Sequence, residues 1–251
     1  MNRDTDFGLA AFHPADPESA RSRNLLWASD LTVLAEHHID GARSQSFLVT
    51  HDGSVTWGVP GEPQLVAIKI QRDLDERLYT FETASHACVP FAQKWLIERG
   101  CPPDAIGQGD GFLTPADDLT VRVEEQIRAS ADRYEVLDSQ CWDDPCESWT
   151  LVRDSGAAQA PIRVFLDTGD LNTSTYTMRE GAFNDAHAAR DWLDKRDGPL
   201  PEPPEYRGDA AALRARAALS RSTGPVPDPQ ASLTTGTTPP VGPRPAPGRS
   251  L

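Results

Sequence analysis

Four strand-like runs follow one another between residues 134 and 179, and they restrict the fold of this chain more than any other feature. The breaks between them, "DDPC", "DSGAAQA" and "DTGDLN", are rich in turn-forming residues. Strands joined by such short breaks pair in antiparallel order. With a helix expected over 182–196, the region predicts an α+β fold: an antiparallel sheet of about four strands closed by a C-terminal helix. The runs cover residues 134–142, 148–153, 161–166 and 174–179.

The residues before this sheet predict a smaller part made of a hairpin and helices. Ser29 suits a helix N-cap. Leu31, Leu34 and His38 follow it at helical spacing, so a helix is expected there. The segment "SFLVTHDGSVTWGV" predicts a hairpin that turns at its Asp-Gly pair. The next run, "LVAIKI", predicts a central strand because it is almost entirely apolar.

Two more helices are expected between these strands. The apolar spacing over 84–99 predicts one, in which Pro90 either kinks the helix or marks its first turn. The other is expected to begin with Thr114 as N-cap and Pro115 in the first turn. No internal repeat is apparent in the sequence.

The changes in composition predict four segments. Residues 1–24 are polar and are expected to form a mobile leader, followed by the hairpin and helix part over 25–110 and the antiparallel sheet over 111–197. Twelve of the 22 prolines lie in residues 198–251, which predicts a stiff linker and a disordered tail.

The charge distribution disfavours some classes of binding partner and is compatible with others. The formal net charge is -14, with a net of -17 in the first 204 residues and +3 in the remainder. Such an acidic body repels phosphate backbones, so we expect no nucleic-acid binding by the folded part, whereas a basic protein partner is compatible with it. The sequence has neither a secretory signal nor an apolar run as long as a membrane span, which predicts a cytoplasmic protein without membrane association.

The segment "QCWDDPCESW" at 140–149 gathers the strongest candidates for a site. Its proline and aspartates suit a hairpin turn between two strands. Its three carboxylates, Asp143, Asp144 and Glu147, are the candidate catalytic groups, and Trp142 and Trp149 are the candidate partner-binding residues.

The cysteines do not form a recognised metal motif. Cys141 and Cys146 are spaced more widely than the pair of a zinc knuckle, and Cys88 and Cys101 flank a predicted helix. The sequence therefore predicts no metal site and no cofactor. Convergence in space of three or more of these thiols and His86 would reverse that expectation.

One triplet resembles a catalytic motif of aspartic proteases. Asp167-Thr168-Gly169 follows an apolar pair, and Asp154-Ser155-Gly156 offers a second triplet. Protease chemistry needs two carboxylates that share a proton, and the strands needed to complete such a fold are lacking. Both triplets are therefore interpreted as hairpin turns.

No catalytic motif thus accounts for the chain. The leading hypothesis is an acidic interaction or regulatory protein that binds another protein. The alternative is a hydrolase that uses the carboxylates around Asp143, Asp144 and Glu147, with or without a divalent cation; it predicts a concave pocket at that turn and an acid whose pKa is raised by burial.

Overall fold

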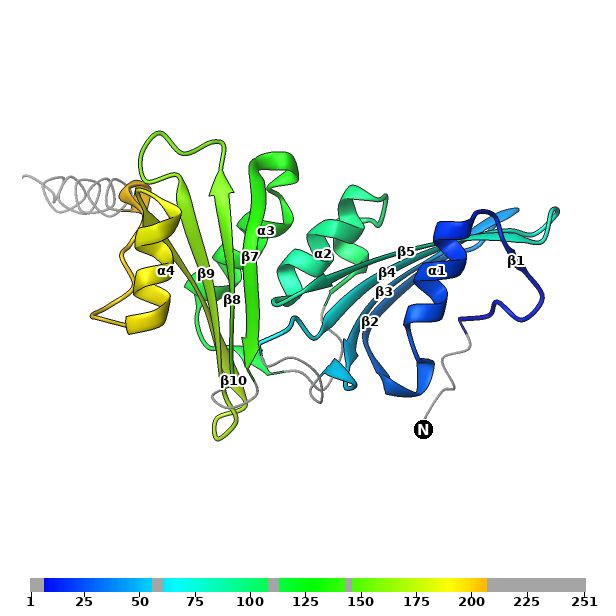
Figure 1. Ribbon diagram of the computed structural model, residues 1–251, viewed down its shortest axis with the longest axis horizontal. Coiled ribbons are helices and arrows are strands. Elements are labelled where there is room, and N and C mark those ends of the chain that lie inside the picture. The colour runs from blue at the N-terminus through cyan, green and yellow to red at the C-terminus, as the bar shows by residue number, and fades with distance from the viewer. Residues whose placement is uncertain (1–6, 56–60, 108–112, 143–145, 207–251) are drawn as a thin grey trace, which may run out of the picture. The chain divides into compact units, whose positions relative to one another are not determined.

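The computed structural model describes residues 7–55, 61–107, 113–142 and 146–206 (Figure 1). Met1–Arg207 form one compact unit, which contains two five-stranded sheets and the helices that cover them. The α+β class is confirmed, but the expected arrangement differs in two respects: the C-terminal sheet has five strands rather than about four, and the N-terminal part is not a smaller hairpin but a second five-stranded sheet.

The first sheet has the strand order β1-β5-β4-β3-β2. Strands β2 to β5 form an antiparallel meander, and the two-residue strand β1 adds to β5 in parallel. Helix α1 precedes the meander and α2 follows it. The elements are β1 His13–Pro14, α1 Pro17–Leu25, β2 Leu31–Ile39, β3 Arg43–Asp52, β4 Leu65–Asp73, β5 Leu78–His86 and α2 Val89–Glu98.

The second sheet repeats this plan with the order β6-β10-β9-β8-β7. Strands β7 to β10 form the antiparallel meander, and β6 adds to β10 in parallel. Helices α3 and α4 cover opposite faces of it (Figure 1). The elements are β6 Thr114–Pro115, α3 Asp118–Arg128, β7 Tyr134–Trp142, β8 Glu147–Asp154, β9 Ile162–Asp170, β10 Thr175–Phe183 and α4 Ala186–Lys195.

The two halves are structural repeats, contrary to the expectation from the sequence. Asp16 caps α1 and Asp117 caps α3, each accepting a hydrogen bond from the backbone N–H three residues later. The first long strand of each repeat also carries a bulge at the same place, at Val33/Ala35 in β2 and at Val136/Asp138 in β7. A shared irregularity of this kind fixes the correspondence of the strands residue by residue.

The closing helices repeat the same contact. The Arg99 guanidinium lies 3.7 Å from the ring centroid of Trp95 in the first repeat. Arg196 lies 4.8 Å from the ring of Trp192 in the second. Each is a cation–π pair at the C-terminal end of the helix that completes its repeat.

Helix α2 is shared between the two cores. Ala92 and Leu96 pack on the first sheet with Phe47 of β3. Ala87, just before the start of the same helix, and Phe91, in its first turn, pack with residues of the second sheet and of α3. The closing helix of the first repeat therefore also buries one face of the second.

The helix expected from Ser29 is wrong, because Leu31–Ile39 form strand β2. Within this strand Leu31 and Ala35 are buried and the residues between them are not. The bulge at Val33/Ala35 interrupts the alternation of inward and outward side chains and produces a spacing of buried residues that resembles a helix.

Other element boundaries differ from expectation for local reasons. Helix α2 has Pro90 in its first turn, so the second of the two alternatives for that proline is confirmed. Helix α3 is capped by Asp117 rather than Thr114, which belongs to β6. Strand β3 ends at Asp52 and pairs with β4, which begins at Leu65; most of the strand expected directly after the Asp-Gly pair falls on residues 56–60, outside the described residues.

The aspartate triplets also differ from each other. Asp154 ends β8 and accepts a hydrogen bond of 2.9 Å from Gly156 N–H, as expected for a turn. Asp167-Thr168-Gly169, by contrast, lies inside strand β9, and the turn that follows is closed by Asp170. The interpretation of this second triplet as a hairpin turn is therefore wrong.

Candidate functional site

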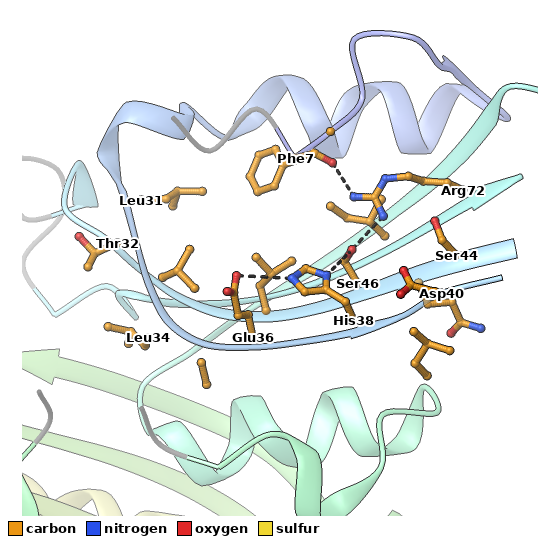
Figure 2. Close-up of a pocket in the computed structure, with 17 residues that line it drawn as sticks. Phe7, Leu31, Thr32, Leu34, Glu36, His38, Asp40, Ser44, Ser46 and Arg72 are labelled. Atoms are coloured by element: carbon orange, nitrogen blue, oxygen red, sulfur yellow. Dashed lines mark hydrogen bonds and ion pairs between the residues drawn. The ribbon is translucent and has the colours of Figure 1, made fainter. Parts of the chain in front are cut away.

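A concave surface of the first repeat lies over β2 and β3, beside the N-terminal segment (Figure 2). We call it the first-repeat groove, and its volume is about 760 Å³. Leu31, Leu48 and Ile70 supply apolar walls on the sheet face that α1 also covers. Such a combination of apolar walls and a few polar groups is typical of binding surfaces.

A chain of polar side chains crosses this groove (Figure 2). Arg72 donates from Nη1 to Ser46 Oγ at 2.8 Å and from Nη2 to the carbonyl oxygen of Phe7. Ser46 Oγ lies 2.9 Å from Nδ1 of His38, whose Nε2 is 3.5 Å from a Glu36 carboxylate oxygen. Ser46 and His38 face each other directly across β2 and β3.

Glu36, His38 and Ser46 are the residue types of a nucleophilic triad, but their setting suits a structural role. Ser46 is only 3% exposed and lies within a strand rather than on a sharp exposed turn. Its oxygen is already engaged by Arg72. These hydrogen bonds therefore hold Arg72 and His38 in place at the groove, and they leave the Ser46 hydroxyl engaged rather than free to attack a substrate.

Arg72 carries a charge that the neighbouring residues do not neutralise. Across residues 7–55, 61–107, 113–142 and 146–206, no carboxylate lies within ion-pair distance of its guanidinium. Half-burial removes water from the group and lowers its pKa by desolvation. An acceptor brought by a bound molecule would be favoured at this position.

The same face of the second repeat is covered by helix α2. Cys88, at its N-cap, lies with its Sγ 3.3 Å from Ser148 Oγ and 3.6 Å from Thr150 Oγ1. The shared bulges place Ser148 and Thr150 at the positions that Ser46 and Leu48 occupy in the first repeat. Both of those counterparts line the open groove.

A smaller cavity remains beneath this cover. We call it the second-repeat cavity; its volume is about 250 Å³. Ser148 and Asp167 line it from β8 and β9, and Ala87 and Val89 line it from the start of α2. Its other lining residues are His51, Gln64, Leu65, Leu113, Cys141, Trp142, Cys146, Glu147, Gly169 and Tyr176.

Asp167 is the most perturbed acid of this cavity. Burial raises its pKa to about 7, and the negative charge of Glu124 adds to the effect. Within the part of the chain that the structure describes, its carboxylate receives no hydrogen bond and forms no ion pair. A carboxyl of this kind in a cavity is a recognised mark of a functional site.

Two of the five residues predicted at the turn, Trp142 and Glu147, line this cavity. Asp143 and Asp144 lie outside the described residues. Glu147 lines the cavity and forms an ion pair with Arg196. Trp142 also lines it and is 39% exposed, whereas Trp149 is 7% exposed and packs in the core beneath α4. Of the two tryptophans, Trp142 is the one accessible to a partner.

The cysteines divide between the two repeats. Cys141 and Cys146 line the second-repeat cavity, and Cys88 packs near Cys141, whereas Cys101 is buried in the core of the first repeat. Burial raises the pKa of Cys88 to about 12, so this thiol stays protonated. In the described ranges, no three His, Cys, Asp or Glu side chains are placed to hold one metal ion.

Sequence reasoning missed the two residues with the most unusual surroundings, Arg72 and Asp167. A signal for them existed in the repeat. "PAD", "YT" and "WL" each occur once in both halves, at the caps, strands and closing helices that correspond. When the two repeats are aligned, Arg72 of the first is equivalent to Gly169 of the second, and Ile70 of the first is equivalent to Asp167 of the second. This alignment marks Arg72 and Asp167 as unusual, because the other repeat has a glycine and a buried isoleucine at the equivalent positions.

None of the helices in the described part of the chain is long and apolar enough to span a bilayer. Comparison of the chain with protein-family models, with curated proteins and with solved structures gives no match.

Proposed function

We propose that this chain is an acidic regulatory protein that binds another protein through the first-repeat groove. The observation that carries the proposal is the difference between what lies on the corresponding faces of the two sheets. Helix α2 packs on the second sheet at Ser148 and Thr150, whereas the corresponding Ser46 and Leu48 lie buried in the first-repeat groove, which also contains the exposed Val33. A helix laid on this surface would bury apolar side chains in the same way.

The groove and the overall charge indicate the chemistry of the partner. The exposed Val33 favours an apolar helix face, and Arg72 favours an acceptor on that helix, such as a carboxylate or a free carbonyl group. The formal net charge of -14 favours a partner that is basic outside this contact, because opposite charges accelerate encounter.

A matched pair of substitutions tests the proposal. Val33 lines the groove and is 36% exposed, and Val136 is its counterpart in the second repeat, 49% exposed and outside the groove. Val33→Arg should weaken binding of a captured partner at least tenfold, whereas Val136→Arg should leave it unchanged. Capture experiments with the intact chain and with a chain ending at residue 207 would identify the partner.

Direct titration of the purified partner must then reproduce the difference. Equal binding by both arginine variants, or capture of no specific protein by either chain, would contradict the proposal. The shorter chain ends at 207 rather than 197 because Leu200, Glu205 and Tyr206 contact the second repeat.

A hydrolase is the second candidate, and one observation favours it. The second-repeat cavity is lined by Glu147 and holds Asp167, whose pKa of about 7 suits a general acid or base; Asp143 and Asp144 lie outside the described residues. Chromogenic esters, phosphoesters and glycosides, each with and without Mg²⁺, test this candidate. Turnover that is lost in Asp167→Asn and kept in Asp170→Asn would support it, and background rates throughout would end it.

A further inference from the structure

The second-repeat cavity contains a negative charge that the fold does not require. Asp167 pairs with Ser148 of β8 and with Met178 of β10. At the same register in the first repeat, Ile70 pairs with Ser46 and Phe81, and Ile70 is completely buried. An apolar side chain therefore satisfies the packing at this position, and the acid needs a different explanation.

The groups around Asp167 do not compensate its charge. Glu124 of α3 bears the charge that acts on it most, and this charge is also negative. Burial keeps the Cys88 thiol neutral, with a pKa of about 12. Glu147 at the cavity mouth is already paired with Arg196. The other polar or titratable groups that line the cavity are His51 and Gln64, joined by a 3.0 Å hydrogen bond, with Cys141, Cys146, Ser148 and Tyr176.

The walls of the cavity suit an organic cation better than a metal ion. Leu65, Ala87, Val89 and Leu113 supply apolar contacts. The described residues offer no set of three His, Cys, Asp or Glu ligands. A volume of about 250 Å³ accommodates a short alkyl chain. An ammonium group has three N–H donors, which the Asp167 carboxylate and the Ser148 hydroxyl can accept.

We propose that the second-repeat cavity binds a primary alkylammonium group, with Asp167 as its counter-ion. The group comes either from a small free amine or from a lysine side chain of another protein. This cavity shares no lining residue with the groove proposed for the protein partner, and the proposal does not depend on that function.

The test uses the full-length protein and three probes. n-Butylamine represents a free amine, Nα-acetyl-lysine amide represents a lysine side chain, and n-butanol is the uncharged control. At least one amine should bind saturably at pH 8 and at least tenfold more weakly at pH 5.5, because protonation of Asp167 removes the counter-ion. Tighter binding of one amine identifies the source of the group. n-Butanol should bind at least tenfold more weakly than the bound amine.

Two further measurements keep the proposal falsifiable. Asp167→Asn should abolish amine binding, whereas Asp170→Asn, which alters an exposed acid of the same strand, should not. In the unaltered protein, the carboxyl carbon signal of Asp167 should titrate at lower pH when the bound amine is present, a readout that needs no variant to fold. Failure of both amines to bind at pH 8, or equal binding by Asp167→Asn, would overturn the proposal.

Discussion

Ser19 and Thr120 perform the same task in the two repeats. The hydroxyl of Ser19, in α1, accepts a hydrogen bond of 3.1 Å from Phe81 N–H of β5. The hydroxyl of Thr120, in α3, accepts one of 3.2 Å from Met178 N–H of β10. Each hydroxyl fastens the opening helix of its repeat to the last strand, and both residues are almost completely buried.

Removal of either hydroxyl should destabilise the protein. In Ser19→Ala or Thr120→Val the backbone N–H of the strand loses its acceptor, which we expect to cost about 1–3 kcal/mol of unfolding free energy. Urea denaturation measures the change. Thr120→Ser keeps the hydroxyl and is the control, and a loss in Thr120→Ser as large as that in Thr120→Val would show that the hydrogen bond is not the cause.

Asp167 should make stability depend on pH in a defined direction. Its pKa rises from 3.8 to about 7 on folding, so between these values the folded protein holds a proton that the unfolded chain releases. Its stabilising effect is therefore complete at low pH and is lost as the pH rises towards 7. Asp167→Asn should be more stable than the unaltered protein by about 1–3 kcal/mol at pH 8, with allowance for water in the cavity.

The same pair of proteins should differ little near pH 4. Chemical denaturation at pH 4 and at pH 8 measures both differences, and the comparison cancels the titration of the other acids. A constant difference at the two pH values would mean that Asp167 does not titrate in this range.

Arg163 should be far more important for stability than an exposed arginine. Its side chain is 1% exposed and lies among Asp154, Glu180 and Glu205, with the shortest ion pair, 2.8 Å, to Glu205. Arg163→Met leaves the buried Glu180 carboxylate without a counter-ion, although Asp154 keeps its ion pair with Arg133, so we expect a loss of about 3–5 kcal/mol. Arg153→Met removes the exposed ion pair with Glu135 and should cost about 1 kcal/mol or less.

Thermal and urea denaturation of these two variants provide the measurement. Similar losses in both would contradict the importance assigned to burial. Because Glu205 belongs to the network, a chain ending before it should lose part of the same stability.

Gly181 should tolerate no larger side chain while Leu200 is present. A Cβ at this position would overlap the Leu200 side chain, with its Cγ at 2.6 Å. We expect Gly181→Ala to destabilise the protein by about 1–3 kcal/mol. In the Leu200→Ala background the same substitution should cost clearly less, and a double-mutant cycle from urea denaturation measures that coupling. Additive effects would show that the overlap is relieved elsewhere.

The sequence predicted helices and strands best where the regular spacing of their buried side chains was uninterrupted. Tyr134–Trp142 form β7 over the expected residues, and the strand at "LVAIKI" is central, as its apolar run indicated. The prediction failed at Leu31–Ile39, where a bulge changed the spacing of the buried side chains. A bulge depends on the partner strand, and a single strand's sequence does not reveal it.

The site was predictable only in part, for a related reason. Trp142 and Glu147, which flank the expected turn, do line a cavity. Asp167, in contrast, looks like a turn residue next to Thr168 and Gly169. Its burial arises from Cys88 and its neighbours, which are distant in sequence and cover the strand only after α2 has packed on it. Arg72 is placed similarly by contacts with Ser46 and Phe7.

The sharing of α2 also bears on how the molecule unfolds. Loss of the first sheet would strip Ala92 and Leu96 of their contacts, and loss of the second would expose Phe91, so neither half can melt without weakening the other. Although the chain contains two copies of one architectural plan, it should denature in a single cooperative transition. A substitution at Phe91 or Ala92 should therefore lower the stability of both repeats together.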